Sequence, residues 1–167
     1  ALMFVQCVET LGAPAVFYQQ LTERPETCRI FVDLFGRSRY LSELLLNHPG
    51  VLDEVVDRVR TVRRETLDSL LEELRSTLEG VAEEAEASRR IQEFRALHFI
   101  HIGILDLSGR LPLDRVLSSL SLVARAILMV IDERSLEQTK QLLGELKADP
   151  KNPPRHAILA LGRLGGD

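Results

Sequence analysis

Residues 83–109 read EEAEASRRIQEFRALHFIHIGILDLSG, and this stretch is the strongest indicator of fold class in the chain. It opens with carboxylates, which are favourable at the positive end of a helix dipole. It closes with Gly109, a residue type that commonly ends helices. Between these ends, core-like apolar side chains recur at helical spacing: Phe94, Leu97, Ile100, Ile104 and Leu105. The pattern predicts one long helix from Glu83 to Ser108.

The segments on either side continue the helical pattern. Residues 51–79 carry an apolar stripe opposite a charged face, which predicts an amphipathic helix, or a pair of helices broken near Arg63 and Arg64. Downstream, Pro112 suits a first helical turn, because its missing N–H costs nothing there. We expect a helix from Pro112 to about Ile131, followed by a weaker helix over the charge-rich residues 132–147.

Two shorter helices are predicted nearer the N-terminus. Pro25 fits the first turn of a helix that runs through Phe35 and stops at Gly36. Ser38 is a plausible N-cap for a helix over residues 39–47. Together with the longer segments, these predict an all-α bundle of about six helices.

Composition supports a helical, globular chain and excludes some functions. The 167 residues include only 5% aromatics and no Trp, with 45% hydrophobic and 28% charged residues. The net charge of −4 argues against a dedicated nucleic-acid binder, which usually shows a basic excess. The longest apolar stretch, Leu120 to Ile131, is short and interrupted by Arg125, so no membrane span is predicted.

Cysteine content and the first residues indicate a cytoplasmic location. Cys7 and Cys28 lie among apolar neighbours at helical spacing, as expected for buried free thiols in a reducing compartment. Residues 1–10 lack the basic segment and cleavage site of a signal peptide. The absence of an initial Met and the abrupt end at Asp167 suggest a piece of a longer protein.

The pattern changes near the C-terminus. Residues 148–155 hold three prolines and predict an extended linker after a helical domain over residues 1–147. Residues 156–161 form a short apolar run, which predicts a strand or extended segment, unpaired within this chain. The run leads into four residues suited to contact a phosphate, three glycines that allow close backbone approach and one cation: Gly162, Gly165, Gly166 and Arg163.

Few residues in the sequence suggest a catalytic or metal-binding role. His98 and His101 are three residues apart on one predicted helix, where a metal site is one interpretation and packed or surface histidines are the bland alternative. The Glu-x-x-His motif of helical metal proteins is missing around both. The sequence contains no nucleophile elbow, Walker A loop or dinucleotide fingerprint.

Four stretches, in order, resemble one protein family. They are RYLSELLLNHPGVLDE at 39–54, RRIQEF through DLSG at 89–109, LPLDRV at 111–116 and AILALGRLGG at 157–166. They are similar to the helical region and the entry into the nucleotidyltransferase fold of the glutamine synthetase adenylyltransferases. The resemblance therefore implies that residues 156–167 are the start of a nucleotidyltransferase domain.

The resemblance carries functional expectations. The family transfers AMP from ATP to a tyrosine of glutamine synthetase and removes it by phosphorolysis. It uses paired aspartates, in an Asp-x-Asp arrangement, to hold magnesium. In this superfamily that pair follows the Gly-Gly turn, so we expect no catalytic or metal-binding residue in this chain and no activity from the chain alone. Part of the nucleotide site would be Gly162, Arg163, Gly165 and Gly166.

Glutamine synthetase, or another protein acceptor, is the implied partner, and a PII-type regulatory protein is a further implied partner of the parent enzyme. The first hypothesis is a helical region that packs beside the nucleotidyltransferase core and helps to place the acceptor. The alternative is a non-catalytic helical interaction module of a signalling protein. A metal-holding bundle at His98 and His101 is the third hypothesis.

Overall fold

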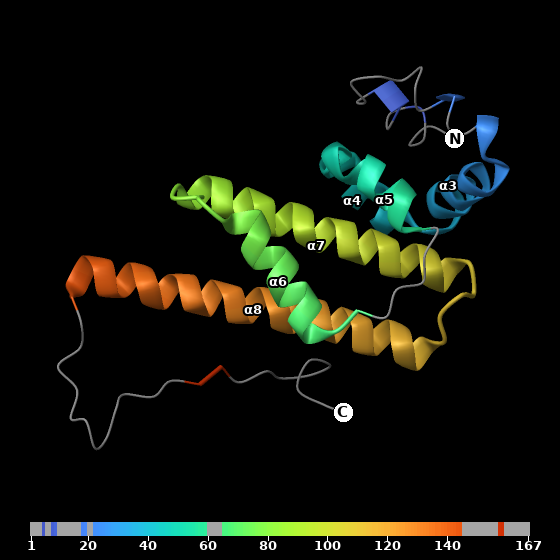
Figure 1. Cartoon of the computed structure of the whole chain (residues 1–167). Helices are drawn as coiled ribbons and strands as arrows, with labels where there is room; N and C mark the ends of the chain where they lie inside the picture. The colour runs from blue at the N-terminus through green and yellow to red at the C-terminus, as the bar shows by residue number, and fades with distance from the viewer. Residues whose placement is uncertain are drawn as a thin grey trace.

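The computed structural model describes residues 22–59 and 65–144, together with Val5, Val8, Glu9, Tyr18, Gln19, Ala157 and Ile158. Among these residues the chain is helical and contains no strand (Figure 1). The prediction of an all-α fold is confirmed. The predicted C-terminal strand lies largely outside the described residues. Ala157 and Ile158, which are described, are exposed and belong to no helix or strand.

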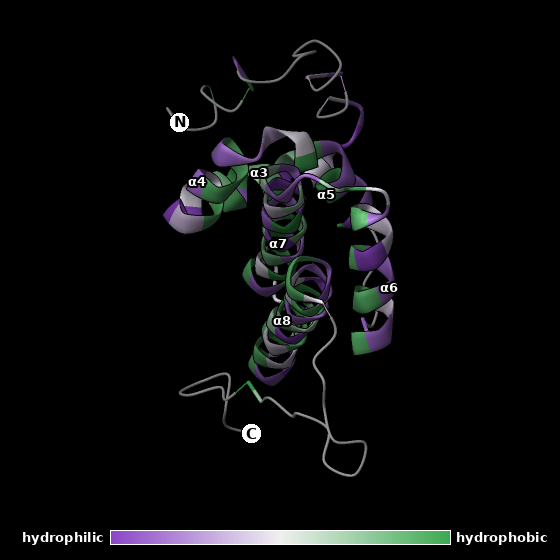
Figure 2. Cartoon of the chain, turned by 90° about the vertical axis from the view of Figure 1, so that its left-hand side faces the viewer, coloured by the Kyte–Doolittle hydropathy of each residue, from purple (hydrophilic) through white to green (hydrophobic). Residues whose placement is uncertain are grey.

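Six α-helices and one short 3-10 helix build the described part of the fold. In chain order they are α3 (Pro25–Arg37), α4 (Arg39–Asn47), η1 (Pro49–Val51), α5 (Leu52–Arg58), α6 (Leu67–Leu78), α7 (Glu84–Leu107) and α8 (Leu113–Leu143). Helix α7 occupies the centre. Helices α3, α4 and α5 pack on one side of it and α6 and α8 on another (Figures 1 and 2).

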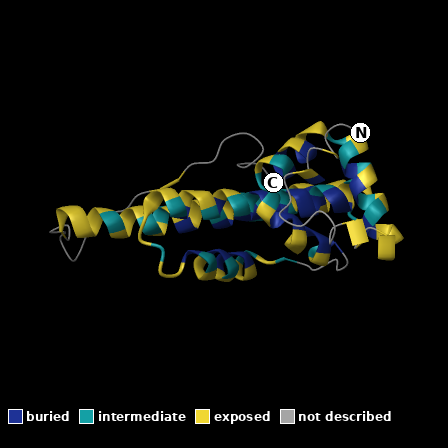
Figure 3. Ribbon diagram, turned by 90° about the horizontal axis from the view of Figure 1, so that it is seen from above, coloured by how far each residue is buried: buried dark blue, intermediate teal, exposed yellow. Residues whose placement is uncertain are grey.

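Two apolar clusters hold these helices together, and α7 contributes to both. Helices α3–α5 supply one cluster and α6 and α8 the other; the fully buried members include Leu34, Leu45, Val55 and Ile100 in the first, and Leu74, Val123 and Ala126 in the second. The middle of α7 is buried on several sides (Figure 3). Its apolar side chains lie all round the helix, as expected for a helix with neighbours on more than one face.

Local sequence explains where the helices begin and end. The Ser38 side chain accepts a hydrogen bond of 3.3 Å from the backbone N–H of Leu41, so the predicted N-cap of α4 is confirmed. Thr66 and Ser69 form a reciprocal capping box at the start of α6. Helix α7 ends as predicted, and Gly109 just beyond it has a φ of +68°, a conformation that favours glycine.

One helix is longer than predicted. Instead of ending at about Ile131, α8 continues without interruption to Leu143. The charged residues beyond Ile131 are held to the bundle by partners on other elements. Arg75 of α6 pairs with Glu133 at 2.6 Å, and Gln138 donates to Glu84 at 2.6 Å. These long-range partners stabilise a segment whose own composition favours a helix only weakly.

Two further boundaries differ from the sequence interpretation. Gly36 does not end α3, which continues through Arg37. Its φ is not positive, so Gly36 is an ordinary helical residue rather than a terminating one. Residues 51–79 contain two helices, α5 and α6, which agrees with the paired alternative; the predicted break at Arg63 and Arg64 lies outside the described residues.

Gly103 allows α7 and α4 to approach closely. A Cβ at this position would overlap Leu41 Cδ1 and lie 3.0 Å from Leu41 Cδ2, and Leu41 is buried. We expect Gly103→Ala to lower the free energy of unfolding by about 1 kcal/mol, because overpacking outweighs the gain in helix propensity. The measurement is urea unfolding followed by circular dichroism. Gly36→Ala is the matched control, since its Cβ would meet nothing within 4 Å.

The control should gain about 0.5–1 kcal/mol from helix propensity. Equal gains in both variants would contradict the role assigned to Gly103.

Candidate functional site

The residues expected to contact a phosphate lie outside the described part of the chain. These are Gly162, Arg163, Gly165 and Gly166. Their role therefore stays a prediction. The described residues contain two other features with functional potential: a buried ionic cluster around His98 and an open cleft beside α3.

His98 of α7 has no exposed surface and lies between two carboxylates. Its Nε2 is 3.2 Å from Glu73 Oε1, within hydrogen-bond distance. Its Nδ1 is 3.1 Å from Glu65 Oε1, in ion-pair range but misaligned for a hydrogen bond, so this attraction is chiefly electrostatic. The ring also packs against Phe94, with 4.3 Å between centroids.

Arg58 connects this arrangement to α5. Its Nη2 lies 2.6 Å from Glu73 Oε1, and its Nη1 lies 3.7 Å from Glu65 Oε1. A third carboxylate, Glu54 on α5 itself, is 2.6 Å from Nη2. We call Arg58, Glu65, Glu73 and His98 the His98 cluster. It ties together α5, the residues before α6, α6 and α7, at the boundary between the two apolar clusters.

The electrostatics of the His98 cluster favour its charged state. Burial would lower the pKa of His98, but hydrogen bonding and attraction to Glu65 and Glu73 outweigh burial and raise that pKa above its ordinary value of 6.5. Burial would likewise raise the pKa values of Glu65 and Glu73. The positive charges of His98 and Arg58 outweigh it and lower both pKa values.

His101 behaves differently from His98. It is 3% exposed, and neither of its ring nitrogens has a hydrogen-bond partner. Burial lowers its pKa, with Arg58 and His98 acting in the same direction, and the attraction to Glu65 across 4.0 Å does not reverse the shift. His101 is thus held as the neutral imidazole.

The two histidines are packed residues of the core. Among the described residues, no group of three His, Cys, Asp or Glu side chains could hold a metal ion. The hypothesis of a metal site at His98 and His101 therefore has no support among the residues that the structure describes. The carboxylates near His98 instead serve as its ion-pair partners.

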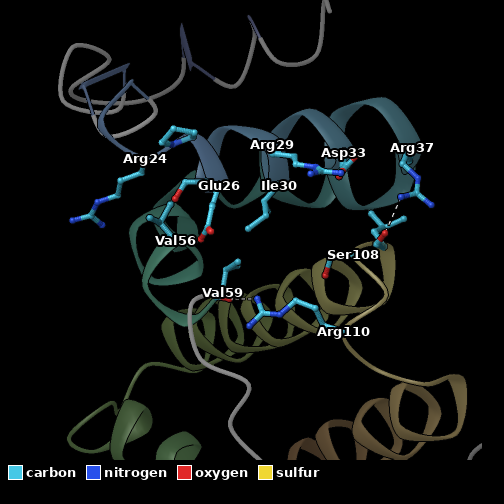
Figure 4. A pocket seen from close by; sticks show the side chains of 13 residues that line it. Arg24, Glu26, Arg29, Ile30, Asp33, Arg37, Val56, Val59, Ser108 and Arg110 are labelled. Atoms are coloured by element: carbon cyan, nitrogen blue, oxygen red, sulfur yellow. Dashed lines mark hydrogen bonds between the residues drawn. The ribbon is translucent and has the colours of Figure 1, made fainter.

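A cleft of about 1380 Å³ opens between α3, the end of α5 and the residues that follow α7 (Figure 4). Glu26 and Ile30 of α3 face Val56 of α5 and Val59, the residue just after α5, across it (Figure 4). Arg110 reaches from below and donates a 2.5 Å hydrogen bond to the Val59 carbonyl.

The chemistry of the cleft is suited to binding. Its described lining mixes arginines and carboxylates with aliphatic side chains, and it holds no histidine, cysteine or glycine. Arg37 contributes a 2.7 Å hydrogen bond to the Leu107 carbonyl, which holds the end of α7 against α3. The lining thus offers charged groups of both signs beside apolar side chains, a mixture that is found at protein-binding surfaces.

Comparison with known proteins gives the family. The family model described as glutamate-ammonia ligase adenylyltransferase matches residues 28–167, which is most of the chain. The chain belongs to this family. The match includes all four residues of the His98 cluster and the glycine-rich residues 162–166.

Curated relatives of this adenylyltransferase family agree. The chain is 25% identical over 161 residues to a protein of Pasteurella multocida, covering 95% of this chain and 16% of that protein. It is 26% identical over 165 residues to one of Aromatoleum aromaticum and 28% identical over 163 residues to one of Pseudomonas aeruginosa. These matches cover 97% and 95% of this chain, respectively, and 17% of each relative. All three carry the name bifunctional glutamine synthetase adenylyltransferase/adenylyl-removing enzyme.

The chain thus spans about a sixth of the length of these family members. No solved structure matches it. None of the described helices is long and apolar enough to cross a membrane.

The sequence analysis did not identify the His98 cluster. Its signal in the sequence was the pair of histidines on an otherwise apolar face of a predicted helix.

Proposed function

We propose that this chain is part of an enzyme that transfers AMP from ATP to a tyrosine of glutamine synthetase and removes it by phosphorolysis. The observation that carries this proposal is the family match over residues 28–167. The names of the relatives, which combine both activities on glutamine synthetase, support it. A PII-type regulator and a cytoplasmic location are further parts of the proposal.

In the proposed arrangement the helices have a structural role and the C-terminal residues contact the nucleotide. Residues 1–147 would form the helical domain, 148–155 the linker and 156–167 the start of a nucleotidyltransferase domain. Gly162, Arg163, Gly165 and Gly166 would then approach the ATP phosphates. ATP and magnesium belong to the longer enzyme. The described residues of this chain do not fit a metal ion, so we assign them no step that passes through magnesium.

An exposed apolar face on α8 supports the packing part of the proposal. Five large apolar side chains recur on one face at helical spacing: Leu113, Leu117, Leu128, Ile131 and Leu142, with exposed fractions from 37% to 83%. Exposed large apolar side chains gathered on one face of a helix often mark an interaction site. Since the relatives are about six times longer than the chain, we propose that the nucleotidyltransferase core covers this face.

The test compares the 167-residue chain with the longer protein that contains it. Each is incubated with glutamine synthetase, magnesium and ATP labelled in the AMP moiety, and label on a glutamine synthetase tyrosine is measured. We expect transfer by the longer protein and none by the chain alone, because the aspartate pair expected in the family follows the Gly-Gly turn.

Transfer by the isolated chain would contradict the assignment of catalysis to other parts of the enzyme. Transfer to a different protein would contradict the acceptor. A longer protein that binds its partner without transferring AMP would support the alternative, a non-catalytic helical interaction module.

A further inference from the structure

His98 lies between two carboxylates, an arrangement that favours the positively charged ring. A neutral imidazole has one N–H and one lone pair, whereas the imidazolium has two N–H groups. In the neutral ring, one nitrogen lone pair would face a carboxylate oxygen at 3.1 or 3.2 Å, from Glu65 or Glu73. That contact is repulsive and buried, so two carboxylates at these distances favour the charged ring.

We propose that the His98 cluster is a proton-controlled connection, which fastens the start of α6 to α5 and α7 when His98 is charged and releases it when His98 is neutral. This role lies outside AMP transfer and does not depend on the proposed function.

The charges around His98 come from every neighbouring element and nearly balance. Helix α5 supplies Arg58, with Glu54 behind it, and Glu65 and Glu73 come from before and within α6. On α7 itself the nearest titratable group is His101, held neutral. Helix α8 places Arg115 in a cavity next to Glu65 and His101. Loss of the His98 proton therefore leaves an excess of negative charge inside the cluster.

A cavity beside Glu65 determines which side of the His98 cluster opens. It has a volume of about 490 Å³ and is lined by Glu65 together with residues of α6, α7 and α8. Glu65 can thus move away from His98 toward water without displacing packed side chains. The later turns of α6 have no such freedom, because Leu74 and Leu78 are buried in the second apolar cluster. We expect release to be confined to Glu65 and the first turn of α6.

The pH range follows from the direction of each pKa shift. The stabilisation from His98 is fully present below pH 6.5 and is lost as the pH rises through its raised pKa in the folded state. The stabilisation from Glu65 and Glu73 is present above about pH 4.5 and is lost as the pH falls through their lowered pKa values. Keeping His101 neutral also favours folding above pH 6.5. The connection is therefore tightest near pH 6.5 and weakens as the pH rises from there toward the pKa of His98.

The experiment measures both halves of the proposal in the 167-residue chain. NMR titration of the His98 ring from pH 5.5 to 9.5 gives its midpoint, and hydrogen exchange at the Leu70 and Leu71 amides reports the first turns of α6. We expect a midpoint above 6.5. Between pH 6.5 and that midpoint, amide protection, corrected for intrinsic exchange, should fall about tenfold per pH unit, as expected for one proton that the fastened state holds more tightly, and it should level off above the midpoint. The Val123 and Ala126 amides of α8 should keep their protection.

Two variants separate the cluster from general charge effects. Glu65→Gln removes one charged partner of His98 and should lower the midpoint by about one pH unit. Glu72→Gln removes a charge from the exposed face of the same helix and should leave the midpoint unchanged. A midpoint at or below 6.5, unchanged α6 protection across the range, or equal shifts in the two variants would overturn the proposal.

Discussion

Replacing His98 with leucine is expected to lower the free energy of unfolding by about 3–5 kcal/mol at pH 7. The substitution keeps an apolar body in the site but removes the positive charge between Glu65 and Glu73. Two carboxylates then lie close together, partly out of water, with only Arg58 to compensate them. Urea unfolding followed by circular dichroism gives the change.

A matched control and a compensating variant show whether charge is the cause. His48→Leu changes a half-buried histidine at the end of α4 and should cost less than about 1 kcal/mol. Combining His98→Leu with Glu65→Gln and Glu73→Gln should recover more than half of the loss, because neutral amides cost less to bury than unpaired carboxylates. Equal losses for His98→Leu and His48→Leu would show that the His98 cluster contributes nothing.

The second large effect is expected in the apolar clusters. Leu45→Ala in the first cluster and Leu74→Ala in the second should each lower the free energy of unfolding by about 2–5 kcal/mol, since both side chains are fully buried. Because α7 belongs to both clusters, we expect either variant to unfold in a single transition that includes all described helices.

The measurement follows each variant by circular dichroism and by hydrogen exchange on both sides of α7. Leu142→Ala, at a side chain that is 83% exposed, is the control and should change stability by less than about 0.5 kcal/mol. Two separate transitions in either buried variant would show that the clusters fold independently.

Features determined by short stretches of sequence were predictable. The cap at Ser38 and the length of α7 depend on residues within a few turns of one another, and both are confirmed. The separation of residues 112–131 and 132–147 into two helices was wrong, since α8 runs uninterrupted to Leu143; its last turns contact Arg75 and Glu84, which are distant in sequence. The composition of the last turns of α8 does not indicate such distant partners.

The His98 cluster could not be predicted for a related reason. Arg58 belongs to a run of arginines that suggests a solvated patch or a partner surface. Glu73 lies among charged residues on one side of an amphipathic helix. Only packing of α5 and α6 against α7 brings them to His98, across 25 to 40 positions of sequence. The family resemblance, by contrast, rested on short motifs and is confirmed by the family match.

Because α8 is one uninterrupted helix, the number of residues along it determines the direction in which the chain leaves its end. At about 1.5 Å and 100° per residue, its 31 residues form a rod of roughly 45 Å. Val123 and Val130 of α8 are buried in the second apolar cluster, and one ion pair joins Glu133 to Arg75 of α6; together they hold the rotation of this rod relative to the bundle. Deleting one residue between Glu133 and Gly144 would therefore turn the direction in which the chain leaves the rod by about 100°. The number of residues in this stretch therefore sets the direction in which the chain leaves α8.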